Sequence, residues 1–126
     1  MTPLEACLEI MDRPWQWGTA DCCGAACAVF HTLYGIDPMR QFRGSYGDRP
    51  GANRFLAEFG GIDGTAETFA EWAGLREVSV LTPGAIGIAI TRQGTDVFGI
   101  CVGDNWAVKS RHGFGTTPFW RRAWVV

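Results

Sequence analysis

Apolar side chains recur at intervals of three and four residues through the first half of the chain, which is the pattern of amphipathic helices. The second of these runs has the clearest boundaries. Asp21 can accept hydrogen bonds from the first free N–H groups of a helix, and Gly35 can adopt the left-handed conformation that ends one. The pattern predicts four helices, at residues 3–12, 22–34, about 50–59 and about 65–73.

The period of the pattern changes after residue 76. Short runs rich in β-branched and aromatic residues follow, separated by turn signals such as Pro-Gly and Gly-Asp-Asn. They predict strands at residues 77–80, 85–91, 96–102, 106–109 and 123–126. Helices followed by strands are typical of an α+β fold, in which the N-terminal helices pack on one face of an antiparallel sheet. No linker interrupts the pattern, so residues 1–126 are expected to form a single domain.

Composition narrows the class of protein. The chain is 47% hydrophobic and 19% charged with a formal net charge of -2, which is ordinary for a globular domain. This charge gives no general attraction to nucleic acid or to an anionic membrane, so neither is an expected partner. No apolar run approaches the ~20 residues that span a bilayer, and the first residues lack a signal-peptide pattern. The odd number of cysteines, three of them in one predicted helix, favours folding in a reducing cytoplasm over a disulfide framework.

A cysteine step opens the second predicted helix. Residues 21–24 read Asp-Cys-Cys-Gly and follow a Pro-Trp-Gln-Trp-Gly segment at 14–18. The free N–H groups and the positive end of the macrodipole favour a thiolate in the first turn of a helix. Cys22 is therefore a candidate nucleophile.

These residues resemble a known family. Segments 14–18 and 21–24, a Pro-Gly-Ala-Ile strand start at 83–86, and the Val-Phe-Gly-Ile-Cys-Val-Gly-Asp segment at 97–104 resemble the conserved segments of the NlpC/P60 cysteine peptidases, in the same order. Those enzymes have a papain-like fold and cut the stem peptides of peptidoglycan. The resemblance covers roughly residues 14–110 and implies the same fold for this chain.

Two further segments resemble a small NlpC/P60-like phage family encoded among tail genes. They are Phe-Arg-Gly-Ser-Tyr at 42–46 and Arg-Ala-Trp at 122–124. This resemblance implies a phage setting, which composition and spacing do not indicate.

Carried over position by position, the resemblance implies an incomplete catalytic set. Cys22 falls on the nucleophile, and Asp21 is the helix cap beside it. The catalytic histidine falls on Val97, the orienting polar residue near Val108, and the oxyanion tyrosine on Trp15. A valine cannot accept a proton, and loss of a general base costs ~10²–10⁴ in rate. The sequence thus predicts a degenerate active site in which Val97 faces Cys22.

Neither histidine of the chain is an obvious replacement. His31 follows Cys22 on the same predicted helix, on the opposite face and about 13 Å along the axis. His112 lies in a predicted turn, where it is either solvated or a relocated base.

A metal site is a further alternative for the cysteines. Cys23 and Cys27 share a helix face, and Cys7 can approach from the first helix. Structural zinc needs four ligands, whereas buried free cysteines usually act as small hydrophobic residues. We therefore expect no metal and no other cofactor.

Two segments are candidate contact surfaces, because arginine and tryptophan dominate interface energetics. The first is the loop at 40–49 and the second is the basic C-terminal end; the candidate residues are Arg43, Tyr46, Arg121, Arg122 and Trp124. The alternatives are an ordinary loop and a core-filling strand. The aromatic and basic loop also admits nucleic-acid binding, which the acidic net charge disfavours.

Together these observations predict a virion component: a structural or assembly protein of a phage tail tip or baseplate, with other phage tail proteins as partners. It would be made in the host cytoplasm and located in the virion tail. One alternative is an active cysteine peptidase or amidase that cuts peptidoglycan during infection. Another is a small intracellular binding module with an inert core cysteine.

Overall fold

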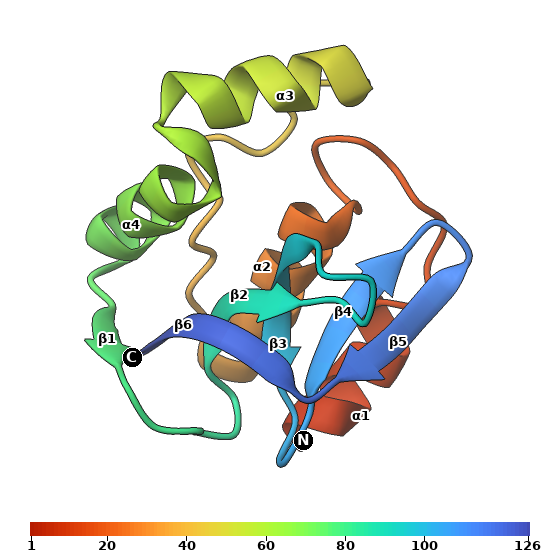
Figure 1. Ribbon diagram of the computed structural model, residues 1–126, viewed down its shortest axis with the longest axis vertical. Coiled ribbons are helices and arrows are strands. Elements are labelled where there is room, and N and C mark those ends of the chain that lie inside the picture. Colours follow the sequence, from red (N-terminus) through yellow and green to blue (C-terminus); the bar gives the residue numbers. More distant parts are fainter.

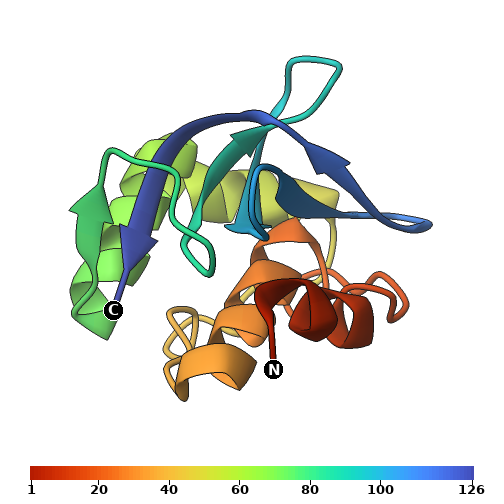
Figure 2. The ribbon, with the colours of Figure 1, turned by 90° about the horizontal axis from the view of Figure 1, so that it is seen from below.

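A curled antiparallel sheet and four helices make up the structure, a computed structural model that describes residues 1–126 (Figure 1). The helices are α1 (Pro3–Ile10), α2 (Cys22–Tyr34), α3 (Arg49–Glu58) and α4 (Gly61–Ala73). The strands are β1 (Arg76–Val78), β2 (Ile86–Ile90), β3 (Asp96–Cys101), β4 (Trp106–Ser110), β5 (Gly113–Thr117) and β6 (Phe119–Val125). The α+β class is confirmed. The sheet arches over α1 and α2 in Figure 2.

The predicted boundaries of α2 are confirmed. The Asp21 carboxylate accepts from the N–H of Gly24, and Gly35 takes a left-handed conformation with φ of 73° at the C-cap. The start of α4 was predicted at Thr65, but the helix begins at Gly61. Gly60 and Gly61 resemble a helix stop in sequence. In the structure Gly60 is the N-cap and Gly61 begins the helix, so only Phe59 and Gly60 separate α3 from α4.

The C-terminal strands differ most from the prediction. Strand β5 was not predicted, because its Gly-Phe-Gly-Thr-Thr sequence resembles a turn, and β6 begins at Phe119 instead of Ala123. The extra length of β6 is stabilised by β2, which pairs with its residues from Phe119 onwards, whereas β1 pairs only with residues 123–125. Such pairing between distant strands overrides weak local propensity.

The sheet closes towards itself. Its strand order is β1-β6-β2-β3-β4-β5, yet only Pro118 separates β5 from β6 in the chain. The sheet must therefore curl until the end of β5 approaches the start of β6. A hydrogen bond supports this approach, because the Thr117 hydroxyl donates to the Ile90 carbonyl over 2.7 Å. The register shifts between Ile88 and Ala89 of β2 because β6 carries one extra residue there, Arg121, and such a bulge bends β6.

The two faces of the sheet carry separate apolar clusters. The face that α2 covers holds Phe98 and Ile100 of β3 within the main core. The opposite face holds a smaller cluster around Trp106, which is fully buried beneath Trp120 with ring centroids 5.7 Å apart. Successive residues of a strand point to opposite faces. This alternation decides which β3 side chains approach the cysteine step.

Candidate functional site

The first turn of α2 is organised by Asp21. Its side chain is 3% exposed and accepts hydrogen bonds from the N–H of Gly24 at 2.8 Å and the N–H of Gly18 at 3.1 Å. The hydroxyl of Tyr46 donates to the same carboxylate over 2.6 Å. A buried carboxylate needs such partners. Asp21 is therefore committed to holding this part of the fold together.

Close packing of the backbone also explains why residue 24 is a glycine. A Cβ at this position would lie 2.3 Å from the carbonyl oxygen of Thr19, well inside the 3.0 Å below which Cβ contacts essentially never occur. Arg43 donates to that same oxygen over 2.9 Å. The first and last residues of the Asp-Cys-Cys-Gly step thus follow from close packing around the start of α2, whether or not the cysteines react.

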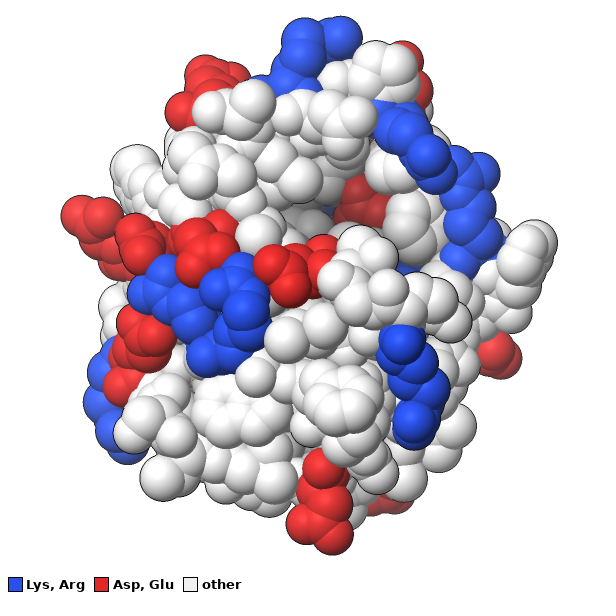
Figure 3. Space-filling view, viewed as in Figure 1, with Lys and Arg blue, Asp and Glu red and all other residues white.

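Cys22 lines a cavity of about 510 Å³ between the start of α2, α3 and the sheet. Figure 3 shows this region as a hollow below α3. Trp15 and Val97, which the sequence placed at the site, line the same cavity. Val108 does not, because its side chain packs in the cluster on the opposite face of the sheet.

The thiol of Cys22 is poorly suited to attack. Burial raises its pKa to about 12, and the negative charge of Asp21 acts in the same direction. The backbone N–H groups of Phe98 and Cys23 oppose this rise without cancelling it. The expectation of a thiolate at the helix N-terminus is therefore wrong, since desolvation outweighs the helix end. At neutral pH the group is a protonated thiol and a weak nucleophile.

The neighbour of Cys22 on β3 differs from the prediction. The Val97 side chain packs with the cluster on the outer face of the sheet, although the residue borders the cavity. Phe98 is the β3 side chain within the main core beside α2. Because successive residues of a strand point to opposite faces, Phe98 and not Val97 is directed towards α2. Phe98 cannot accept a proton either.

The position next to Val108 carries a charged group. Lys109 is 5% exposed and lines the cavity. Its ammonium donates to the carbonyl of Met11 over 2.7 Å and to the carbonyl of Arg13. These contacts fix Lys109 to the end of α1, where it is a structural anchor.

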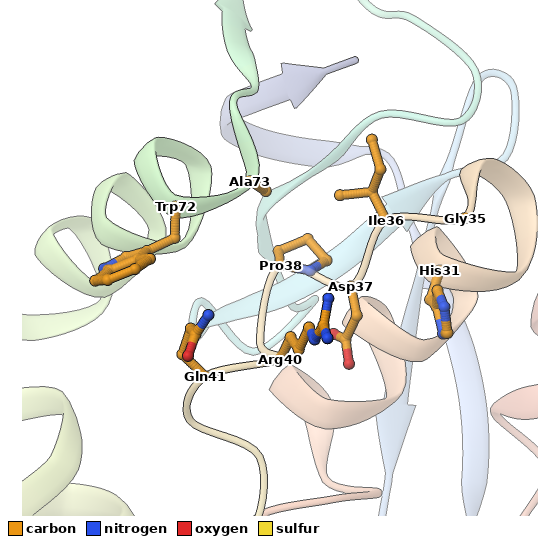
Figure 4. A pocket seen from close by; sticks show the side chains of 9 residues that line it. All are labelled: His31, Gly35, Ile36, Asp37, Pro38, Arg40, Gln41, Trp72 and Ala73. Carbon is orange, nitrogen blue, oxygen red and sulfur yellow. The ribbon is translucent and has the colours of Figure 1, made fainter.

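Neither histidine is placed beside Cys22. His31 is exposed in the last turn of α2, where it borders a second cavity of about 510 Å³. Figure 4 shows it across that cavity from Trp72, with Asp37 and Arg40 between them. His112 is exposed in the turn between β4 and β5 and does not line the Cys22 cavity. No histidine therefore reaches this cavity.

The predicted contact residues of the 40–49 loop have partners within the chain. Arg43 forms two hydrogen bonds of 3.0 Å with the Asp37 carboxylate, in addition to its bond to Thr19. Tyr46 is bound to Asp21. Both side chains attach the loop to α2, so their geometry has an internal explanation.

The two predicted contact arginines near the C-terminus also have partners within the chain. Arg121 pairs with Asp63 at 2.6 Å and Asp96 at 3.0 Å. Arg122 pairs with carboxylates of α4 and β1, among them Glu77 at 2.7 Å, and lies 4.8 Å over the ring of Trp124. Trp124 is only 5% exposed because it faces the main core, so its assignment to a contact surface is wrong.

All five cysteines are free thiols. The Cys23 sulfur lies 4.0 Å from the sulfur of Met39 inside the core, and burial raises its pKa. No group of three histidine, cysteine, aspartate or glutamate residues is placed to hold a metal ion.

Sequence reasoning missed one group at the cavity. Trp15 and Trp17 meet edge to face with ring centroids 5.1 Å apart. Arg111 lies over both rings, and Arg49 lies over Trp17. The Trp-Gln-Trp spacing beside the cysteine step was a visible signal. The arginines were not, because they come from distant parts of the chain.

Comparison with known proteins places the chain in a family. Residues 2–126 match the family described as Domain of unknown function (DUF6950), so the chain belongs to that family. No curated protein and no solved structure matches the chain. None of the helices has both the length and the apolar character required to cross a bilayer.

Proposed function

We propose that this chain is a non-hydrolytic structural or assembly domain of a phage tail tip or baseplate, built on a degenerate NlpC/P60 scaffold of papain-like type. The proposed lack of hydrolytic activity rests on the residues that line the Cys22 cavity. The cavity contains no histidine, and burial keeps the thiol protonated at neutral pH. A cysteine hydrolase needs an activated thiolate and a base within reach.

The arrangement of elements supports the scaffold assignment. The segment at 97–104 that resembles an NlpC/P60 strand forms most of β3 and the turn after it, and β3 lies beside α2. Cys22 stands at the start of α2 and faces that strand through the backbone of Phe98. The phage setting rests on the resemblance of segments 42–46 and 122–124 alone.

The hydrolytic part is tested with peptidoglycan stem peptides and mass spectrometry. Purified protein is expected to give no more product than the Cys22→Ala variant. Cys23→Ala is the matched control, since its thiol is the neighbouring one but is buried in the core. Product formation that is lost in Cys22→Ala and retained in Cys23→Ala would instead establish the peptidase alternative.

The virion part needs a separate experiment. An antibody against the chain is applied to purified phage particles from the source culture and located by immunogold electron microscopy. Label at the end of the tail is the expected result. Unlabelled particles, with the protein confined to the cell lysate, would contradict the assignment to the virion.

A further inference from the structure

Four of the residues that line the cavity beside Cys22 lie against one another, and we term them the Arg–Trp cluster: Trp15, Trp17, Arg49 and Arg111. The guanidinium of Arg111 lies 5.7 Å from the ring centroid of Trp15 and 5.2 Å from that of Trp17. Arg49, at the first turn of α3, lies 6.0 Å from the Trp17 ring. Two elements far apart in sequence thus each bring a cation to one tryptophan pair. Figure 3 shows basic side chains along one rim of the hollow.

Both cations of the Arg–Trp cluster lack a carboxylate partner. Every ion pair in the chain is made by Arg43, Arg121 or Arg122. The two carboxylates on the cavity wall are occupied, since Asp21 caps α2 and Asp96 pairs with Arg121. A guanidinium stacked on an aromatic ring keeps its edge N–H donors free for a bidentate contact. The cavity therefore presents two cationic groups without a carboxylate partner.

The interior of the same cavity is largely apolar. Its wall includes Leu56 of α3, Ile62 of α4 and Phe98 of β3, and more than half of its lining residues are hydrophobic. A site with apolar walls and cations at its rim fits a ligand that combines apolar groups with negative charge.

We propose that this cavity binds an acidic peptide segment of a partner protein, with carboxylates on Arg49 and Arg111 and an apolar side chain inside. The inference rests on the proposed non-hydrolytic role of this cavity, and it names the chemistry of the partner. Single-stranded nucleic acid also combines anions with apolar rings, but it requires free aromatic faces for stacking. Here the tryptophan faces are already engaged by arginine, which favours the peptide.

Fluorescence anisotropy tests the proposal with a labelled peptide of alternating glutamate and leucine. The matched probes are a glutamine–leucine peptide, a lysine–leucine peptide and a labelled oligothymidylate. The acidic peptide is expected to bind more tightly than all three. Its affinity is also expected to fall as sodium chloride is raised, because the contacts at the rim are exposed to solvent.

Substitutions locate the binding site. Arg49→Gln and Arg111→Gln are each expected to weaken binding of the acidic peptide roughly 2- to 5-fold, the range for a solvent-exposed ion pair. Arg111→Lys should lose less than Arg111→Gln, since it keeps the charge without the planar fork. Arg54→Gln is the control, because Arg54 is an exposed residue of α3 that does not line this cavity. Arg49 and Arg111 are both exposed, so circular dichroism should show unchanged folding.

Three results would overturn the inference: equal binding of the glutamate and glutamine peptides, tighter binding of the oligothymidylate, or full binding by the Arg49→Gln/Arg111→Gln double variant. The salt titration uses only the unmodified protein, so it tests the role of charge even if a variant fails to fold. Failure here is distinct from failure of the proposed function. Binding followed by cleavage of the peptide would refute the non-hydrolytic role alone, whereas absence of both binding and cleavage would refute only the present inference.

Discussion

The hydroxyl of Tyr46 donates to the carboxylate of Asp21 over 2.6 Å, and this contact joins the loop before α3 to the N-cap of α2. The two residues are separated by 25 positions in the chain. Burial raises the pKa of the Tyr46 hydroxyl, so it stays protonated and remains a donor well into alkaline pH. The pair fixes the start of α2 before any ligand is present.

Replacing Tyr46 by phenylalanine should therefore lower stability without altering the fold. One oxygen of the buried Asp21 carboxylate would lose its shortest hydrogen bond, a loss of about 1–3 kcal/mol in the free energy of unfolding. Urea denaturation followed by tryptophan fluorescence measures the difference. Tyr34→Phe is the control, because Tyr34 is exposed, and it should change stability little. Equal effects of the two substitutions would show that the Asp21 contact contributes nothing.

Gly24→Ala should be strongly destabilising. The added methyl group would meet the Thr19 carbonyl at 2.3 Å, and the backbone must move to relieve the clash. Overpacking of this kind costs about 1–3 kcal/mol or more. Gly47→Ala is the matched control, since a Cβ there meets nothing within 4 Å. Thermal unfolding of both variants gives the comparison, and a Gly24→Ala melting temperature equal to that of Gly47→Ala would contradict the packing argument.

Alkylation of Cys22 should be slow at neutral pH and accelerate as pH rises towards 12. With the thiol pKa raised to about 12, its thiolate fraction at pH 8 is roughly a thousandfold smaller than that of an ordinary cysteine. Mass spectrometry of the Cys22 peptide after timed iodoacetamide treatment measures the rate. The same protein in urea is the control and should react at the ordinary rate. Rapid labelling of the folded protein at pH 7 would show that the thiol is activated.

Acid should weaken the ion-pair network at Arg122. The guanidinium groups lower the pKa of Asp63, mainly through Arg121, and that of Glu77 through Arg122. A carboxyl group whose pKa is lower in the folded than in the unfolded state stabilises the fold fully when the pH is above the unfolded-state pKa. This stabilisation is lost as the pH falls through the folded-state pKa. Stability should therefore decline below about pH 4.

Arg122→Gln should flatten that decline. Because the carboxylates are partly exposed, the loss at pH 7 should stay near 1 kcal/mol or less for each pair. Urea midpoints measured from pH 3 to pH 7 test this, with Arg40→Gln as a control that removes an exposed arginine outside every ion pair. Parallel pH profiles for Arg122→Gln and the unmodified protein would contradict the expectation.

Local signals were sufficient to predict much of the fold from the sequence. The cap at Asp21 and the stop at Gly35 define α2 through contacts within a few residues, and both are confirmed. Strand β5 was missed because its pairing with β4 is not encoded in its own glycine-rich residues. Tertiary partners stabilise such a segment, and a local pattern cannot reveal them.

The candidate site was predictable in position but not in chemistry. The cysteine step does open a helix, as its motif indicated, and the structure adds that this end of the helix lies at a cavity. The pKa of Cys22 depends on burial by residues from other elements, which spacing does not report. The sequence did not reveal which face of the sheet the Val97 side chain occupies, because a shift of one residue along a strand moves a side chain to the opposite face. Arg49 and Arg111 meet at Trp17 only through the tertiary fold.

The anchor between Lys109 and the end of α1 has a consequence for the order of assembly. Lys109 donates to the Met11 carbonyl across 98 positions of the chain. During synthesis the C-terminal end of α1 must therefore wait for β4 to leave the ribosome before this anchor forms. Contacts of such long sequence separation close late and slow folding. A nascent chain that stops before β4 leaves the carbonyls of Met11 and Arg13 without the Lys109 donor, and such an incomplete intermediate is a substrate for chaperones.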